Sequence, residues 1–281
     1  AGFVDNLAGT APTAHFIPPT EKSFLNCATC HDSAAPAAEQ HVRQIANVVF
    51  PSGLSVTTGG NSKVCFNCHA GRKSKAGVDA AVPTGGFYNF GDVDPHLLPS
   101  AAVLFGPLAR GGYEYPGMDY AITFASVHIS ASCVTCHMAA GPAANWNLGG
   151  HALAMTDGSA LNTTACSSFR CHGPVTSFDV RGTDTQGTVN SLLAQLDTAL
   201  AAKGVVKRTP FESPYFDNIA VMTAPFPQAA LLRAAYNYRF VSSDPGAYVH
   251  NYWYAARLLY DSLDELDDGI QNGTVSFSGT A

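Results

Sequence analysis

Four short stretches of the chain, residues 27–31, 65–69, 133–137 and 166–172, limit what it can fold into. Each holds two cysteines and a histidine directly after the second; two residues separate the cysteines in three stretches and four in the last. Cys-x-x-Cys-His is the attachment signature of a c-type haem, which is held by two thioethers and takes the histidine as an axial iron ligand. The chain must therefore fold around four large, rigid, apolar groups as well as around its own side chains.

The cysteine count favours haem attachment over other uses of paired cysteines. A zinc site needs no histidine directly after its cysteines, a disulfide framework leaves the histidines unexplained, and a thioredoxin-like motif would occur once. The four stretches use every cysteine, so we predict covalent attachment at Cys27, Cys30, Cys65, Cys68, Cys133, Cys136, Cys166 and Cys171. The predicted proximal iron ligands are His31, His69, His137 and His172. The predicted cofactors are four c-type haems, with haem iron as the only metal.

The composition predicts few regular elements. Glycine (26) and proline (17) are frequent, and only 13% of the residues are charged. Porphyrins supply apolar surface that side chains provide in other proteins. We therefore expect a multihaem cytochrome c fold, mostly coil with a few α-helices and minimal β-structure, wrapped around a chain of stacked haems.

Hydrophobic periodicity divides the chain. Residues 1–26 are expected to form an extended arm, because prolines and glycines interrupt any pattern. Residues 27–281 are expected to form a single domain, haem-binding over 27–172 and helical over 187–269. The helices are strongest near the C-terminus, where leucines recur on one face: from Asn190 or Ser191 to Gly204, over 227–240, and over 252–266 with Gly269 as the stop. Weaker patterns predict a helix over 37–49 and strands over 54–58 and 274–277.

Charge and hydropathy exclude two classes of partner. The net charge is −6 and no basic stripe could neutralise phosphates, so nucleic acid is not an expected partner. No apolar run reaches the roughly 18 residues of a membrane-spanning helix.

The acidic run over 261–268 is expected to be a solvated helix face, with a calcium or partner contact as the alternative. The chain starts at Ala1 without the pattern of a signal peptide, which we expect to have been removed already. Thioether attachment follows export, so an extracellular or periplasmic location is expected.

The histidines outside the motifs decide whether the irons are open or closed. A second protein ligand closes the sixth iron position and leaves electron transfer as the main task. Six further histidines are present, enough for four haems. His41 is disfavoured because it follows its own haem motif closely. The candidate distal ligands are His15, His96, His128, His151 and His250.

Two blocks of sequence carry a family resemblance. The first joins Gly111-Gly112-Tyr113-Glu114-Tyr115-Pro116-Gly117, His128, the third motif and Gly149-Gly150-His151, and resembles the central block of many multihaem cytochromes. The second, Ala234-Ala235-Tyr236-Asn237-Tyr238 followed by Asp244-Pro245-Gly246-Ala247-Tyr248-Val249-His250-Asn251, is similar to their C-terminal block. The arrangement also resembles the C-terminal half of pentahaem nitrite reductase. That resemblance implies that His250 ligates the third haem, His128 the fourth, and His151 one of the first two.

The whole chain is most similar to small extracellular tetrahaem cytochromes that polymerise into conducting filaments (OmcE-like). This resemblance implies a bis-histidine electron carrier that assembles end to end as a homopolymer. Its further partners would be other redox proteins or extracellular electron acceptors. In that family one subunit completes a haem of the next, and the Pro-rich arm makes His15 the candidate donated ligand, with His96 as the substitute if the arm is intramolecular.

Two alternatives remain open. The first is a multihaem reductase of nitrite, hydroxylamine or a sulfur oxyanion. The nitrite reductases of the resembled class hold their catalytic haem through a lysine, and no Cys-x-x-Cys-Lys occurs here. The second is a periplasmic electron shuttle that does not polymerise.

Overall fold

A computed structural model describes ten segments of the chain. They are residues 27–31, 42–82, 94–95, 98–121, 126–142, 145–167, 172–180, 184–207, 216–217 and 228–275. The expected arm over 1–26 lies outside them, as do His15, His41, His96 and Cys171.

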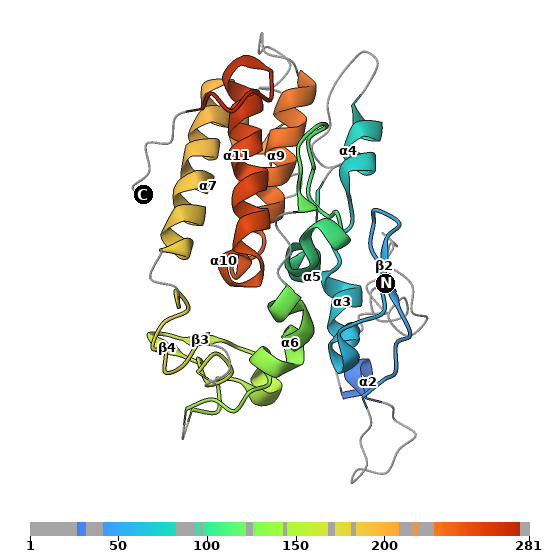
Figure 1. Ribbon diagram of the computed structural model, residues 1–281, viewed down its shortest axis with the longest axis vertical. Coiled ribbons are helices and arrows are strands. Elements are labelled where there is room, and N and C mark those ends of the chain that lie inside the picture. The colour runs from blue at the N-terminus through green and yellow to red at the C-terminus, as the bar shows by residue number, and fades with distance from the viewer. Residues whose placement is uncertain are drawn as a thin grey trace.

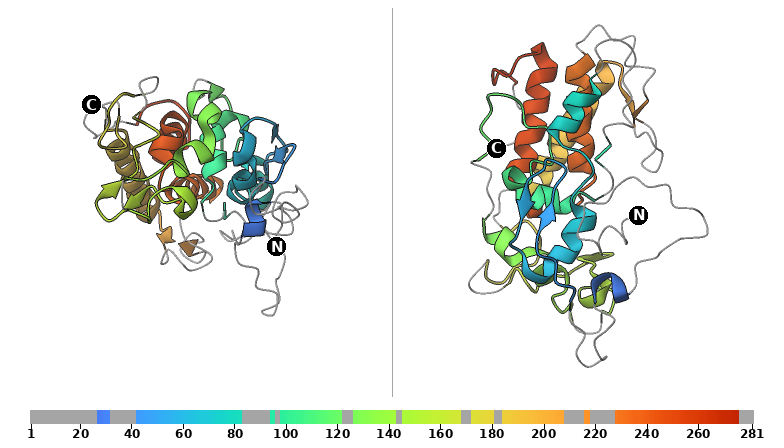
Figure 2. Two further views of the ribbon diagram at one scale, coloured as in Figure 1. Left: turned by 90° about the horizontal axis from the view of Figure 1, so that it is seen from below. Right: turned by 90° about the vertical axis from the view of Figure 1, so that its right-hand side faces the viewer.

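Three long helices form one end of the molecule. They are α7 (Thr185–Ala202), α9 (Gln228–Ser242) and α11 (Tyr252–Asp268), and they lie side by side in each view (Figures 1 and 2). Each helix buries an apolar face in a common core, represented by Leu196 of α7, Leu232 of α9 and Leu259 of α11. The expectation that the strongest helices lie near the C-terminus is confirmed.

Side-chain caps mark where α7 and α11 begin. At the start of α11 the side chain of Asn251 accepts a hydrogen bond from the Tyr254 N–H at 3.2 Å, and the helix ends at the predicted Gly269, where φ is 88°. The prediction that α7 begins at Asn190 or Ser191 is wrong. Asp184 caps this helix instead, accepting from the Gly187 N–H at 3.0 Å, because its carboxylate satisfies a backbone donor of the first turn.

The remaining elements of the described chain are short. Three short helices, α2 (Cys27–Cys30), α3 (Lys63–His69) and α6 (Ser126–His137), lie toward the other end of the molecule, whereas α4 (Lys75–Ala81) lies at the height of α9 (Figure 1). The other short elements are α5 (Ser100–Phe105), α10 (Ala247–His250) and the 3-10 turns η3 (Gly60–Ser62), η5 (Gly106–Leu108) and η7 (Gly150–Ala152). The strands of the described residues form two-residue antiparallel pairs: β1 (Val48–Val49) with β2 (Ser55–Val56), β3 (Thr156–Asp157) with β4 (Ala160–Leu161), and β5 (Val206–Lys207) with β6 (Phe216–Asp217). The expected fold was mostly coil with a few α-helices and minimal β-structure around stacked haems. The described residues are mostly helix and coil and confirm the minimal β-structure, and the stacking of haems stays a prediction.

Two weak predictions are corrected. The helix over 37–49 is wrong in its described part, because Val48 is fully buried and pairs with Val56 in β1 and β2. A β-branched residue that packs on a core favours a strand over a helix. The strand over 274–277 is wrong at Thr274 and Val275, which carry no strand pairing; its last two residues lie outside the described residues.

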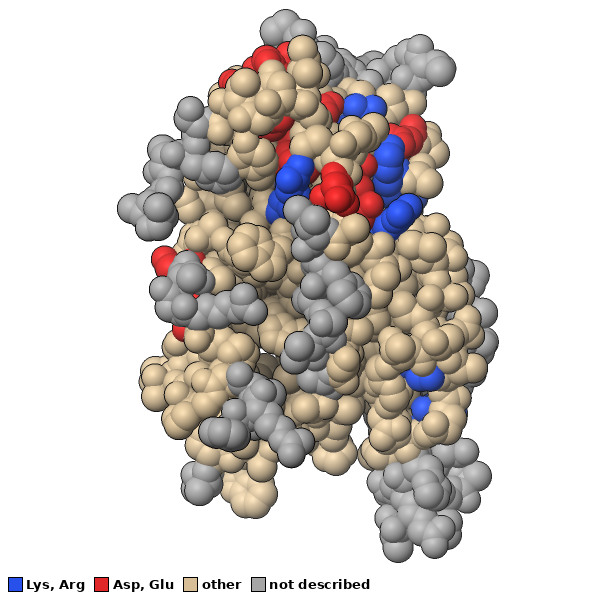
Figure 3. All heavy atoms as spheres, viewed as in Figure 1, with Lys and Arg blue, Asp and Glu red and all other residues tan. Residues whose placement is uncertain are grey.

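The acidic run at the end of α11 is mostly buried, which contradicts the expected solvated face. Asp261, Asp264 and Glu265 are buried, and only Asp267 and Asp268 are exposed. Burial is possible because each buried carboxylate has internal partners. In Figure 3 the charged side chains on this face gather at the end formed by the long helices, and the opposite end is nearly uncharged.

The partners of the buried acids are specific. Asp261 contacts Arg257 at 2.9 Å, and Glu265 contacts Arg233 at 3.0 Å. Asp264 accepts from the backbone N–H groups of residues 272, 273 and 274 at 2.8, 2.9 and 3.1 Å. These carboxylates fasten the following segment to α11.

Asn237 of α9 joins three parts of the core. Its Oδ1 accepts from the Tyr113 N–H at 2.7 Å, and its Nδ2 donates to the Tyr113 carbonyl and to Ser262 Oγ, both at 3.0 Å. Asn237 and Tyr113 are fully buried. One amide side chain therefore satisfies both backbone groups of a buried residue 124 positions away.

Replacing Asn237 by Ala should lower the free energy of unfolding by about 2–4 kcal/mol, because two buried backbone groups of Tyr113 lose their partners. Thermal unfolding of the haem-loaded protein, followed by far-UV circular dichroism, measures the loss. The matched control is Asn147→Ala, in an exposed loop, which should leave the melting temperature nearly unchanged. Equal melting temperatures for both variants would contradict this role of Asn237.

Candidate haem-binding site

Six of the seven histidines in the described residues form three close pairs. The ring centroids are 6.1 Å apart for His31 and His151, 6.2 Å for His137 and His250, and 6.3 Å for His128 and His172. Each pair joins the histidine that ends a cysteine motif to one predicted as a distal ligand. The structure therefore brings together segments separated by up to 120 residues of sequence, as the step from 31 to 151 illustrates.

The spacing of these pairs fits one metal ion between two imidazoles. A metal–imidazole bond of about 2 Å on each side, added to the ring radii, places the centroids about 6 Å apart. The described residues thus fit a haem iron with two axial histidines.

The motifs lie on helical turns that present both cysteines on one side. In α3, Cys65 and Cys68 are three residues apart, a spacing that shares one helix face, and His69 closes the helix. The same arrangement ends α6 with Cys133, Cys136 and His137. Such a turn lets both sulfurs reach one edge of a porphyrin while the histidine turns beneath it.

The helix α6 serves two of the pairs. His128 lies near its start and the third motif at its end, and Ser132 between them has φ 59° and ψ −176°, which kinks the helix. Because of the kink, the two halves of α6 have different directions. One element therefore carries His128, which pairs with the histidine of the fourth motif, and the cysteines of the third motif.

Hydrogen bonds fix which ring nitrogen is free for a metal. Nδ1 of His69 lies 2.8 Å from the Leu98 carbonyl oxygen, and Nδ1 of His137 lies 2.8 Å from that of Leu153. An imidazole that donates from Nδ1 keeps the lone pair of Nε2 for iron. Burial lowers the pKa of His137, and the neighbouring imidazole of His250 lowers it further. The hydrogen bond to Leu153 opposes this shift without cancelling it. The lowered pKa favours the neutral form that binds metals.

His250 has a carboxylate partner. Its Nδ1 lies 2.7 Å from Oδ2 of Asp244, whose side chain is 1% exposed. Burial opposes both charges, but the mutual attraction and the hydrogen bond outweigh it. The pKa of His250 is raised and that of Asp244 is lowered, so the carboxylate stays ionised. The sequence contained this Asp six residues before the histidine, but sequence reasoning assigned it no role.

Gly149 allows the turn that carries His151. Its φ is 68°, and a Cβ at this position would lie 1.9 Å from the carbonyl oxygen of Ala139. Only glycine combines that backbone conformation with such a close approach. The following turn, η7, holds His151, and the next residue, Leu153, supplies the carbonyl that contacts His137. One short segment therefore positions groups beside two histidine pairs.

The motifs themselves lie close to one another. The thiols of Cys65 and Cys133 share a hydrogen bond, which raises the pKa of Cys65. Partial burial raises the pKa of Cys30 and of Cys68, and the negative charge of an ionised Cys65 raises both further. The first three motifs thus form a continuous group.

His69 differs from the other motif histidines. Among the described residues no histidine ring pairs with it, and the remaining candidates, His15 and His96, lie outside them. Cys166 and His172 of the fourth motif are described, whereas Cys171 is not.

The contacts of Leu98 and Leu153 with the motif histidines are made by backbone carbonyl groups. No side-chain signal in the sequence could therefore have identified these two residues.

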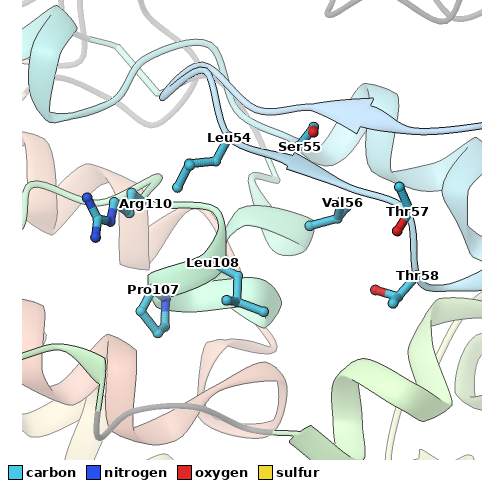
Figure 4. A pocket seen from close by; sticks show the side chains of 8 residues that line it. All are labelled: Leu54, Ser55, Val56, Thr57, Thr58, Pro107, Leu108 and Arg110. Carbon is cyan, nitrogen blue, oxygen red and sulfur yellow. The ribbon is translucent and has the colours of Figure 1, made fainter.

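A groove and two absences complete the picture of the described residues. A shallow groove between β2 and η5 is lined by Leu54, Leu108, Arg110 and their neighbours, and it contains no histidine or cysteine, so it is separate from the candidate site (Figure 4). Within the same residues, no three His, Cys, Asp or Glu side chains are arranged to hold a bare metal ion, and no helix is long and apolar enough to cross a membrane.

Sequence comparison identifies similar proteins in Geobacter sulfurreducens. The chain is 28% identical to the C-type polyheme cytochrome OmcB of strains PCA and DL-1/KN400 in an alignment 336 positions long, which covers 98% of this chain and 44% of OmcB. It is 27% identical to the C-type polyheme cytochrome OmcC in an alignment 305 positions long, which covers 91% of this chain and 38% of OmcC. The chain therefore spans less than half the length of these relatives. No family model and no solved structure matches. The similarity to OmcB and OmcC, together with the histidine pairs, supports placing this chain among the multihaem c-type cytochromes.

Proposed function

We propose that the chain is an electron carrier that binds four c-type haems, each held by two histidines. The observation that carries this proposal is the set of three histidine pairs with centroids 6.1–6.3 Å apart. A haem iron between two imidazoles has no open position and exchanges electrons rather than binding a substrate. The names of OmcB and OmcC describe polyheme c-type cytochromes, which supports the same class of cofactor here.

The pairs suggest a ligand assignment. We assign His31 and His151 to the first haem, His137 and His250 to the third, and His172 and His128 to the fourth. These are the pairs with the observed spacing. They agree with the pairing that the resemblance to pentahaem nitrite reductase implied for the third and fourth haems.

We propose that the haems form one electron path through the chain. The side chains of Cys65 and Cys133 lie next to each other, so porphyrins attached to them would approach each other at their attachment edges. The kinked α6 would connect the third haem to the fourth, because it carries a residue for each. Stacked haems within contact distance are the arrangement expected of a molecular wire.

We further propose that the chain polymerises end to end and works outside the cell. The second haem needs a distal ligand that the described residues do not supply, and a donated His15 would provide it from a neighbouring subunit, with His96 as the intramolecular substitute. Trp146 is 90% exposed and Trp253 58% exposed, and large apolar side chains in water favour association. An exported periplasmic carrier is the alternative, and the electron partners are other redox proteins or extracellular acceptors.

A reductase is the second candidate, because His69 has no paired histidine in the described residues. If nothing ligates the second haem opposite His69, its iron would be open to nitrite, hydroxylamine or a sulfur oxyanion. The two candidates differ in the spin state of that one iron.

The purified protein should contain four haems per chain by pyridine haemochrome analysis, because all four motifs can attach one. Its oxidised electron paramagnetic resonance spectrum should be entirely low-spin. Fewer than four haems would contradict the cofactor assignment. A high-spin signal of about one haem in four would contradict the electron-carrier proposal and favour the reductase.

Replacing His128, His151 or His250 by Ala should each open one haem. In each variant one iron should become high-spin and bind carbon monoxide in the reduced state, while three remain low-spin. The matched control is His41→Ala, which should leave all irons low-spin because we assign His41 no ligand role. A fully low-spin spectrum in any of the first three variants would overturn that ligand assignment.

Replacing His15 by Ala should open the second haem and remove filaments from negative-stain micrographs, since one bond would serve both ligation and assembly. His96→Ala is the comparison, and should keep filaments and four low-spin irons if His15 is the donor. Normal filaments with four low-spin haems in His15→Ala would contradict the donated ligand.

A further inference from the structure

We propose that Asp244 is a positioning residue that lowers the reduction potential of the third haem by its hydrogen bond to His250. This inference rests on the proposed ligation of that haem by His137 and His250. It goes beyond that ligation, because it assigns the control of potential to a residue that touches neither the iron nor the porphyrin-attaching cysteines.

The carboxylate is fixed in place on both of its oxygens. Oδ2 faces Nδ1 of His250 at 2.7 Å, while Oδ1 accepts from Ser100 Oγ at 2.9 Å and from the Gly246 N–H at 3.2 Å. The side chain is 1% exposed, so water does not compete for these contacts. Asp244 therefore cannot turn away from the histidine without breaking bonds on its other side.

The imidazole is also held from the other direction. A Cβ at Gly246 would lie 2.7 Å from Cε1 of the His250 ring, so the ring lies directly against the backbone at this glycine. The next residue, Asn251, caps α11, so His250 is joined directly to the first turn of this helix. These restraints fix the hydrogen bond between His250 and Asp244.

A carboxylate partner acts on an axial imidazole in two ways that have the same sign. It draws the Nδ1 proton and makes the ring a stronger electron donor to iron. Its negative charge, buried where screening by water is weak, also favours the oxidised iron, which carries one more positive charge than the reduced form. Both effects stabilise the oxidised haem and lower its potential.

The hydrogen-bond partners of the motif histidines can be compared with the carboxylate partner of His250. His69 and His137 contact backbone carbonyl oxygens, which carry no net charge. Nδ1 of His31 is buried and has no hydrogen-bond partner in the described part of the chain. The third haem would combine a carbonyl-bonded histidine, His137, on one side with a carboxylate-bonded histidine, His250, on the other.

The test is a potentiometric titration of the haem-loaded Asp244→Asn variant, followed by visible and electron paramagnetic resonance spectra. One of the four midpoints should move to higher potential, and the other three should stay in place. His250→Ala identifies the third haem, because that midpoint disappears from the low-spin set. The matched control is Asp264→Asn, an equally buried aspartate elsewhere in the same helical end, which should lose stability without moving any midpoint.

Ser100→Ala provides a second variant that keeps the charge of Asp244. Loss of the hydroxyl leaves more of the carboxylate's charge for His250, so the third midpoint should move to lower potential. An unmoved third midpoint in both variants, or an equal shift of all four, overturns the role of Asp244. Four low-spin haems in His250→Ala would instead overturn the proposed ligation, so the two failures are distinguishable.

Discussion

The pairing of two histidines from distant parts of the chain is the constraint on which the rest of the structure depends. Each pair joins a motif to a segment outside it, and the three pairs together connect residues 31, 128, 137, 151, 172 and 250. The elements around them are short, with strands of only two residues in the described part of the chain. Short elements bury little surface of their own. On our account, iron–histidine bonds and porphyrin surface provide the cohesion that long strands and helices provide elsewhere.

The long helices serve this site by holding its most restrained histidine. His250 ends α10 directly before α11, and Asp244 follows α9, so the orientation of both depends on the packing of α9 against α11. The same helices bury charged residues in internal pairs, such as Arg233 with Glu265. Removing one partner of such a pair leaves an uncompensated buried charge. Under the proposed ligation, the helical end would set the position and the electrostatics of the third haem, while loops and short turns would set those of the others.

Part of the molecule could be predicted from the sequence. The cysteine motifs followed from their spacing, and the helices ending at residues 242 and 268 followed from hydrophobic periodicity. The pairing of His128 and His250 with particular motifs was implied by a family resemblance, and the ligand role of these histidines stays a prediction. The start of α7 was missed because Asp184 competes with Asn190 and Ser191 as a cap. The burial of Asp261 and Asp264 was missed because periodicity does not reveal which charges find internal partners. Leu98 and Leu153 act through carbonyl groups, which every residue possesses.

The central claim is that each described histidine pair holds one iron, and the positions of the irons test it most directly. A structure of the haem-loaded protein, with anomalous scattering measured on either side of the iron absorption edge, would locate every iron without reference to the chain. Our account predicts four iron peaks, three of which lie midway between His31 and His151, between His137 and His250, and between His128 and His172. An iron peak bonded to only one histidine of such a pair, with the other ring turned away, would contradict it.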